Sequence, residues 1–115
     1  MSEIKELTDK IIAFRDVRDW KQFHTPKDLA TGLLLEAGEV AEHFHWKNES
    51  ELQEYIKNHR EEIGEELGDV MNYLLLMAHD FGIDLFQATV KKVEKNGRNY
   101  PVEKSKGNSK KYTEF

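Results

Sequence analysis

LLLEAGEVA (residues 33–41) and ELGDVMNYLLLM (residues 66–77) are the two stretches that decide the fold. Each is apolar enough to form the buried face of a helix, yet each carries two carboxylates three residues apart. An unpaired carboxylate on an apolar helix face costs several kcal/mol of desolvation. The two pairs therefore predict a positive charge between them, and a divalent metal ion is the simplest candidate. The four residues are Glu36, Glu39, Glu66 and Asp69.

Hydrophobic periodicity predicts an all-α chain. With 2 prolines and no strand-like alternation, the sequence leaves little room for a sheet. Cap residues mark the starts of the expected helices. The stretch that ends at Phe81 is either one long helix or two helices with a break near Asn58-His59. The expected helices run from a Ser2 cap to about Lys21, from a Thr25 cap and Pro26 to about Trp46, from Asn48 or Ser50 to Phe81, and from an Asp84 cap to about Lys95.

The chain is expected to need a second copy of itself. Its 115 residues suit one domain, but a hydrophobic fraction of 38% is low for a self-sufficient core of this size. The helix containing residues 66–77 is apolar or acidic almost all round, so one bundle alone would leave apolar side chains in water. We therefore expect a four-helix-type bundle completed by homo-oligomerisation.

Charge is distributed unevenly along the chain. Residues 1–90 contain 9 Lys and Arg against 19 Asp and Glu, whereas residues 91–115 contain 8 against 3. An acidic body does not suit a nucleic acid polymer, which requires a broad basic face. The pattern favours a small anion that is bound through metal ions by the acids and directly by lysine.

Cysteine and long apolar runs are both absent from the sequence. With 0 cysteines, disulfides and thiolate metal sites are excluded, and a reducing cytoplasm fits the composition. No apolar run reaches the roughly 20 residues that span a membrane, so no membrane partner is expected.

A metal centre explains the four carboxylates better than chance does. Residues three apart lie side by side on a helix, so two antiparallel helices would bring both pairs to one point. Their repulsion would raise their pKa values unless a hard cation such as Mg²⁺, for which Mn²⁺ can substitute, bound between them. Such ions serve phosphoryl chemistry, and Glu36 or Glu39 could also take a proton from water.

Further motifs accompany the two carboxylate pairs. They are RDWKQFHTP (18–26), FHWK (44–47), EELGDV (65–70) and KKYT (110–113). Together with the carboxylate pairs, these motifs resemble those of the all-α nucleoside triphosphate pyrophosphohydrolases of the MazG-like superfamily, in the branch of deoxycytidine triphosphate pyrophosphatases. The resemblance covers roughly residues 5–114.

The resemblance implies Mg²⁺-dependent hydrolysis of a (deoxy)nucleoside triphosphate, dCTP or a related pyrimidine nucleotide, to the monophosphate and pyrophosphate. It also implies a homodimer or homotetramer and places the metal on the four carboxylates. Residues 1–96 would form the helical pyrophosphohydrolase domain, and residues 97–115 a basic irregular tail that contributes to or covers the site. The expected substrate-binding residues are Trp20, Phe23, His24, Trp46, Lys47, Tyr73, Lys92, Asn96, Lys110 and Lys111.

Within this set, aromatic rings would stack on the base and lysines would contact phosphate. Tyr73 follows Asp69 by one helical turn, so its hydroxyl would meet the sugar or a water held by the metal. A pocket that packs tightly around deoxyribose would reject a 2′-hydroxyl sterically. The glycines within the helices, Gly32, Gly38, Gly64 and Gly68, are expected to permit close helix packing.

Two positions depart from the pattern of that branch. Ile11 stands where the animal enzymes have a histidine, which bears on base preference. Asn99 stands where an arginine is usual, which bears on one phosphate contact that Arg98 could replace.

Two other classes of function remain open from the sequence. One is a helical interaction module without catalysis. The other is a di-iron carboxylate protein, for which the chain offers a single Glu-x-x-His unit, Glu42 to His45, where such bundles use two.

Overall fold

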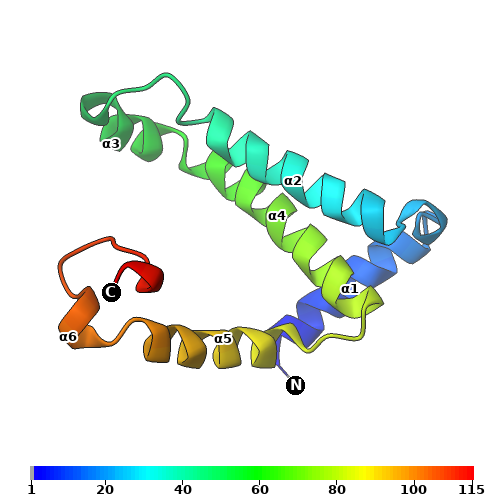
Figure 1. Ribbon diagram of the computed structural model, residues 1–115. Coiled ribbons are helices and arrows are strands. Elements are labelled where there is room, and N and C mark those ends of the chain that lie inside the picture. Colours follow the sequence, from blue (N-terminus) through cyan, green and yellow to red (C-terminus); the bar gives the residue numbers. More distant parts are fainter. Residues whose placement is uncertain (1) are drawn as a thin grey trace. The chain divides into compact units, whose positions relative to one another are not determined.

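The computed structural model describes residues 2–115, which form helices and no strand (Figure 1). The all-α prediction is therefore confirmed. The chain divides into two compact units, the first ending at Gly82 and the second beginning at Ile83. The elements are α1 (Glu3–Asp16), η1 (Lys21–Phe23), α2 (Pro26–Glu42), α3 (Glu49–Asn58), α4 (Arg60–Asp80), α5 (Leu85–Asn99), α6 (Val102–Ser105) and η2 (Tyr112–Glu114), where η denotes a short 3₁₀ helix.

Side-chain caps begin four of the helices, as the sequence predicts. In each case the cap oxygen accepts a hydrogen bond from the backbone N–H three residues later, at 3.0 to 3.2 Å. Such a cap stabilises a helix by about 1 kcal/mol. The caps are Ser2 for α1, Thr25 for α2, Asn48 for α3 and Asp84 for α5.

Several predicted helix ends are wrong by a few residues. α1 ends at Asp16 instead of about Lys21, and α2 ends at Glu42 instead of Trp46. After each end comes a non-glycine residue with left-handed backbone, Asp19 at φ 54° and Trp46 at φ 67°, which a continuing right-handed helix cannot contain.

The structure also defines the break in the third predicted stretch and the end of α5. The third stretch is two helices, α3 and α4, separated at His59, whose φ of −124° and ψ of 25° leave the helical region. α5 continues to Asn99 instead of ending near Lys95.

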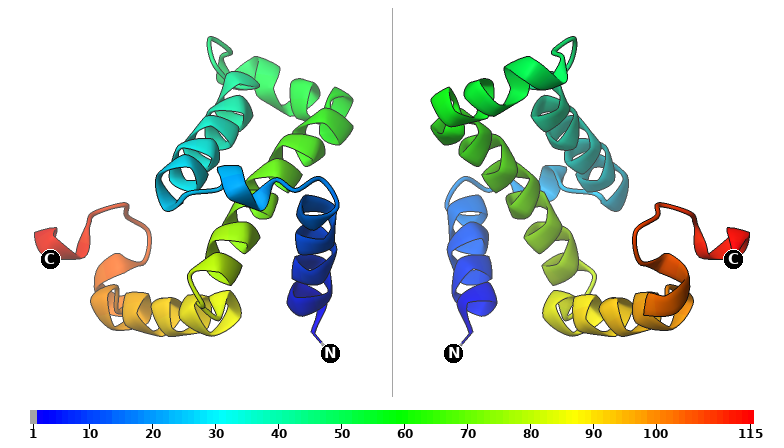
Figure 2. Two further views of the ribbon diagram at one scale, coloured as in Figure 1. Left: turned by 90° about the vertical axis from the view of Figure 1, so that its right-hand side faces the viewer. Right: turned by 90° about the vertical axis from the view of Figure 1, so that its left-hand side faces the viewer.

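The first unit is built around an antiparallel pair of helices. α2 and α4 lie side by side in opposite directions, and α3 forms the connection between them (Figures 1 and 2). α1 packs against the C-terminal part of α4 (Figure 2). The small apolar core lies at this end of the pair, and its buried members are Leu29, Leu75, Leu76 and Ala78.

A buried ion pair joins α1 to the end of α4. The Arg15 side chain is 2% exposed, and its Nη1 and Nη2 donate hydrogen bonds to the two carboxylate oxygens of Asp80 at 2.7 and 2.8 Å. This hydrogen bonding, together with the guanidinium charge, lowers the pKa of Asp80. Because removing either partner would leave a buried charge unpaired, the pair fixes where α1 lies on α4.

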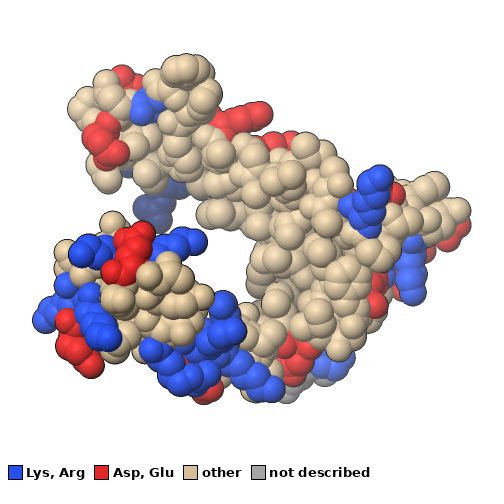
Figure 3. Space-filling model, viewed as in Figure 1, with Lys and Arg blue, Asp and Glu red and all other residues tan. Residues whose placement is uncertain are grey.

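The second unit contains α5, α6 and η2. Tyr100 packs edge-on against Tyr112 and Phe115, with ring centroids 5.7 and 5.8 Å apart. Lys and Arg side chains gather over α5 and α6 (Figure 3). Residues 97–115 are expected to form an irregular tail. In the structure α5 continues through Asn99, and two short helical turns follow, α6 after Pro101 and η2 near the C-terminus. The functional division expected at residue 96 stays a prediction.

Among the described residues, no helix is both long and apolar enough to cross a membrane. The space-filling view shows a broad face without charged side chains over α2 and α4 (Figure 3).

Candidate functional site

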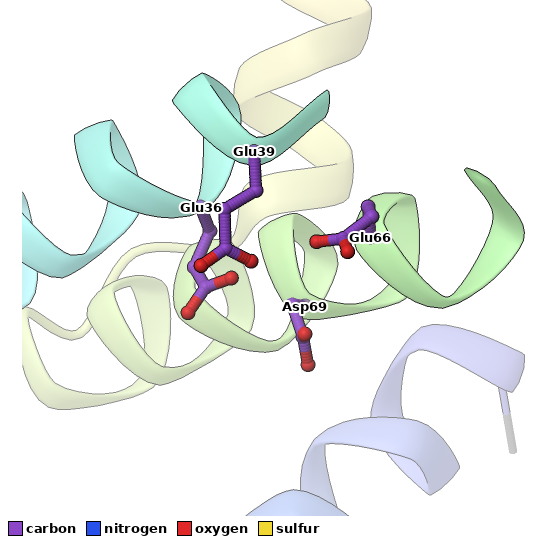
Figure 4. Close-up of side chains that lie close together, drawn as sticks. All are labelled: Glu36, Glu39, Glu66 and Asp69. Carbon is purple, nitrogen blue, oxygen red and sulfur yellow. The ribbon is translucent and has the colours of Figure 1, made fainter. Parts of the chain in front are cut away.

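Four carboxylates from two helices meet in the first unit. Each offers a ligand oxygen, and these oxygens all lie within 4.8 Å of one another. Figure 4 shows Glu36 and Glu39 extending from α2 toward α4, which carries Glu66 and Asp69. The juxtaposition predicted from the spacing of the two pairs is present, because α2 and α4 are antiparallel neighbours.

Burial leaves part of this carboxylate cluster without partners. Glu36 and Glu66 are half-buried, whereas Glu39 and Asp69 are exposed. One oxygen of Glu36 and one of Glu66 are buried and accept no hydrogen bond. Buried polar atoms in native proteins are nearly always satisfied, so two orphaned acceptors in one cluster indicate that a donor or cation belongs there.

Hydrogen bonding, burial and mutual repulsion together raise the pKa values of two members of the cluster. Hydrogen bonding with the Glu39 carboxyl, burial and the negative charges around it raise the pKa of Glu66 to about 7. Burial, followed by contact with Glu39, raises the pKa of Glu36. Both shifts mean that the folded chain resists holding all four groups ionised.

The cluster fits a hard divalent cation. Its donors are all carboxylate oxygens, the ligand type that Mg²⁺ and Mn²⁺ prefer, and it contains no imidazole or thiolate. A cation would satisfy the orphaned oxygens and offset the repulsion that contributes to the two raised pKa values.

A cavity of about 400 Å³ adjoins the carboxylate cluster. Asp69 belongs to both, so the cavity opens beside the cluster. Its walls come from α1, from the segment after α1 and from α4. They are formed by Lys10, Ile11, Phe14, Arg15, Trp20, His24, Asp69, Asn72, Tyr73 and Leu76.

The cavity is mainly apolar with a few polar groups. The Phe14 and Trp20 rings pack edge to face with centroids 5.8 Å apart. His24 Nδ1 lies 3.4 Å from Arg15 Nη1, and burial together with the Arg15 charge lowers the pKa of His24. An apolar pocket with a small number of fixed polar groups is typical of a small-molecule site.

The structure brings together some of the predicted substrate-binding residues. Trp20, His24 and Tyr73 all line the cavity. Phe23 and Trp46 are exposed outside it, Trp46 by 92%. Lys47 lies with its Nζ 4.2 Å above the Tyr55 ring, away from the cavity. The other four are in the second unit: Lys92, Asn96, Lys110 and Lys111.

Several residues that line the cavity are not among those predicted from the sequence. Ile11, expected only to bear on base preference, lines the cavity. The other residues outside the expected set are Lys10, Phe14, Arg15, Asn72 and Leu76. Their helical spacing was visible: Ile11 and Phe14 are three apart on α1, as are Asp69 and Asn72 on α4. Which face of α1 meets α4 depends on the Arg15–Asp80 pair, which no local pattern indicates.

The glycine prediction holds at one position only. A Cβ added to Gly32 would meet the ring of Tyr73. At the other three positions an added Cβ meets nothing within 4 Å, so close packing within this chain does not explain them. Those positions are Gly38, Gly64 and Gly68.

The chain is similar to known proteins in sequence and in fold. The model of the MazG-like family matches residues 33–115. The chain is 42% identical over 104 residues to dCTP pyrophosphatase 1 of Mus musculus and 41% identical over 104 residues to that of Homo sapiens. In both cases the match covers 89% of this chain, and the chain spans 61% of the length of these curated relatives.

A solved structure is also similar. A pyrophosphatase from Archaeoglobus fulgidus superimposes with a TM-score of 0.83 and 37% identity. The match covers 88% of this chain and 94% of the archaeal one.

Proposed function

The chain belongs to the MazG-like family, and from this membership and the geometry of the site we propose that it is a Mg²⁺-dependent nucleoside triphosphate pyrophosphohydrolase. The proposed substrate is dCTP or a related pyrimidine deoxynucleotide, and the products are the monophosphate and pyrophosphate. The observation that carries the proposal is the position of Asp69, which belongs to both the carboxylate cluster and the cavity.

One nucleotide would use both parts of the site. Its triphosphate needs cations, which the four carboxylates are suited to hold, and its base needs an apolar pocket with an aromatic wall, which Trp20 and Phe14 supply. Because Asp69 lies at the junction, a base in the cavity directs its phosphates toward the cluster.

The four carboxylates would hold Mg²⁺, which when bound neutralises phosphate charge and makes water more acidic. Glu36 or Glu39 is proposed to accept the proton of the attacking water, because a carboxylate positioned beside that water can act as a general base. In the overall reaction, the water oxygen bonds to the α-phosphorus, the bond from that phosphorus to the bridging oxygen breaks, and pyrophosphate leaves.

Base recognition is proposed for the cavity. Ile11 and Leu76 give it apolar sides. His24, whose lowered pKa favours the neutral ring, accepts from Arg15 Nη1 through Nδ1 and so offers its Nε2–H as a donor. The names of the relatives, dCTP pyrophosphatase 1, support cytosine as the base. Phe23 and Trp46 are exposed rings that remain proposed base contacts.

The second unit is proposed to supply phosphate contacts through Lys92, Asn96, Lys110 and Lys111. Support for this role comes from the net charge of residues 91–115, which hold 8 Lys and Arg against 3 Asp and Glu. Lys47 is a further proposed phosphate contact. Location in the cytoplasm, expected from the absence of cysteine, also stays a proposal.

A homo-oligomer, either a dimer or a tetramer, is proposed as the working form. Few side chains are buried among residues 2–115, while large apolar side chains on α2 and α4 are exposed. Exposed apolar area of this extent favours an interface. The exposed side chains in question are Leu34, Leu35 and Leu67.

A panel of nucleoside triphosphates tests the proposal. Pyrophosphate release is measured for each deoxynucleotide and ribonucleotide with Mg²⁺, with Mn²⁺ and with chelator. The proposal expects fastest release from a pyrimidine deoxynucleotide, dependent on the metal. No release from any member would favour a non-catalytic interaction module, and iron-dependent absorbance with no release would favour a di-iron protein.

A further inference from the structure

Arg15, His24 and Asp80 form a chain of hydrogen bonds at the wall of the cavity. Arg15 and His24 line the cavity, and Asp80 is the last residue of α4. Asp80 accepts from Nη1 and Nη2 of Arg15 at 2.7 and 2.8 Å, and Nη1 also lies 3.4 Å from His24 Nδ1. The side chains of Arg15 and Asp80 are only 2% and 13% exposed, so water has little access to their contact.

The guanidinium decides which nitrogen of His24 carries the proton. Arginine has only donors, so a hydrogen bond between Arg15 and His24 requires His24 Nδ1 to be the acceptor. A neutral imidazole that accepts at Nδ1 has its proton on Nε2. The other tautomer would point an Nδ1–H at an N–H of Arg15. Burial and the Arg15 charge both lower the pKa of His24, which agrees with a neutral ring.

Asp80 holds Arg15 in the orientation that this bond needs. Two parallel hydrogen bonds to one carboxylate fix the plane of a guanidinium as well as its position. Arg15 cannot turn away from His24 without breaking a buried ion pair and leaving its charge unpaired. His24 therefore has a fixed donor at Nε2, and it cannot become an acceptor there to suit a different ligand.

We propose that Arg15 is a positioning residue for base selection: it holds His24 as an Nε2–H donor, so that the cavity accepts cytosine, whose N3 is an acceptor, and rejects uracil and thymine, whose N3 carries a hydrogen. The proposal rests on the proposed function, because it assumes a pyrimidine base in the cavity. A donor that faces N3–H would leave two donors without partners inside the cavity. A mismatch of this kind discriminates by roughly 10- to 100-fold.

The tautomer of His24 in the wild-type protein is the first measurement. It is read from the ¹⁵N chemical shifts of the ring by NMR, without ligand and with dCMP or dUMP bound. We expect the proton on Nε2 alone in all three states, and a proton on Nδ1 would overturn the proposal. His43, whose Nδ1 lies 2.7 Å from the Tyr55 hydroxyl oxygen and outside the cavity lining, is the internal reference.

A double variant, Arg15→Leu with Asp80→Leu, removes the donor to His24 and leaves no buried charge unpaired. For this variant and wild type, kcat/KM is measured for dCTP and dUTP with Mg²⁺, and binding of dCMP and dUMP is measured by tryptophan fluorescence. We expect the cytosine-to-uracil ratio to fall by roughly 10-fold or more, because His24 is then free to take the Nδ1–H form when dUMP binds. A ratio equal to that of wild type would overturn the proposal.

Leu75→Ala is the matched control for a loss of packing. Leu75 is 1% exposed, lies in the same half of α4 as Asp80 and is not a lining residue. Leu75→Ala should lower the thermal midpoint yet keep both the wild-type ratio and the Nε2–H form of His24. If the ratio falls as far in Leu75→Ala as in the double variant, Arg15 acts only through stability and the proposal is overturned.

A nucleotide analogue keeps the proposal testable should the double variant fail to fold. In 3-deaza-dCMP a C–H group replaces N3, while the exocyclic amine and the O2 oxygen remain. Wild-type protein should bind this analogue about tenfold more weakly than dCMP, since His24 Nε2–H loses its acceptor. Equal binding of the two would show that N3 is not read and would overturn the proposal.

The outcomes distinguish this proposal from the proposed function. Wild-type protein that hydrolyses dCTP and dUTP equally well would overturn the role of Arg15 and leave pyrophosphohydrolase activity standing. If no nucleotide is hydrolysed, but dCMP binds more tightly than dUMP and the double variant loses that preference, the role of Arg15 stands and the proposed function fails.

Discussion

The two halves of α4 differ in burial and in the residues they contribute. The N-terminal half carries Glu66 and Asp69, and its Leu67 is 54% exposed. The C-terminal half contributes Leu75, which is 1% exposed, and ends in the ion pair of Asp80 with Arg15. One continuous helix therefore carries two of the clustered carboxylates at one end and most of the buried core at the other.

α2 repeats this division in the opposite direction. Its first turn contains the buried Leu29, and Glu36 and Glu39 follow two to three turns later. Because α2 and α4 are antiparallel, the buried residues of both helices meet at one end of the pair, and all four carboxylates meet further along (Figures 1 and 4). Repulsion within the cluster is tolerated because packing elsewhere holds the two helices together.

The largest expected effect comes from the acidic end. Glu39→Gln should reduce pyrophosphate release by roughly 10²- to 10⁴-fold, because it removes a metal ligand and a candidate base. The free energy of unfolding should not fall, since one repelling charge is removed. Glu65→Gln, at an exposed neighbour outside the cluster, is the control and should keep wild-type activity. Full activity in Glu39→Gln would remove Glu39 from the site.

Substitutions in the C-terminal half of α4 should lower stability, in contrast to Glu39→Gln. Leu75→Ala should lower the free energy of unfolding by about 2–5 kcal/mol, because it opens a cavity in the core. Chemical denaturation measures this, and Leu67→Ala is the matched control in the same helix. We expect a small loss for Leu67→Ala, which grows with protein concentration if a second copy covers that residue. Equal and concentration-independent losses would contradict the division of α4.

The smallest effect concerns pH. The folded-state pKa of Glu66 is raised from 4.5 to about 7, so the folded chain binds this proton more tightly than the unfolded chain does. Without metal, the thermal midpoint should therefore fall as pH rises between these values. Mg²⁺ should reverse that fall, and Glu66→Gln should flatten it. A metal-free midpoint that rises steadily over this range would contradict the assigned repulsion.

Local sequence predicted the helices and their caps well, because Thr25-Pro26 and Asp84 act on the turn that follows them. It predicted the carboxylate cluster as well, because spacing fixes the faces of α2 and α4. It did not predict the ends of α1 and α2, where Asp19 and Trp46 take left-handed backbone that local propensity disfavours.

The cavity could not be predicted from local sequence, because it depends on a contact between residues that are far apart in the chain. Arg15 and Asp80 are 65 positions apart, and their pairing decides which face of α1 meets α4. Likewise, four helix glycines look alike in sequence, and only the position of the Tyr73 ring distinguishes Gly32 from the others.

The central claim is that the acidic end of the α2–α4 pair is a metal centre, and titration with Mn²⁺ followed by electron paramagnetic resonance tests it most directly. The account predicts saturable binding of Mn²⁺ to wild type, competition by Mg²⁺, retention of binding in Glu65→Gln and its loss in Glu39→Gln. Wild-type protein that leaves Mn²⁺ free in solution, or Glu39→Gln that binds it as wild type does, would contradict the account.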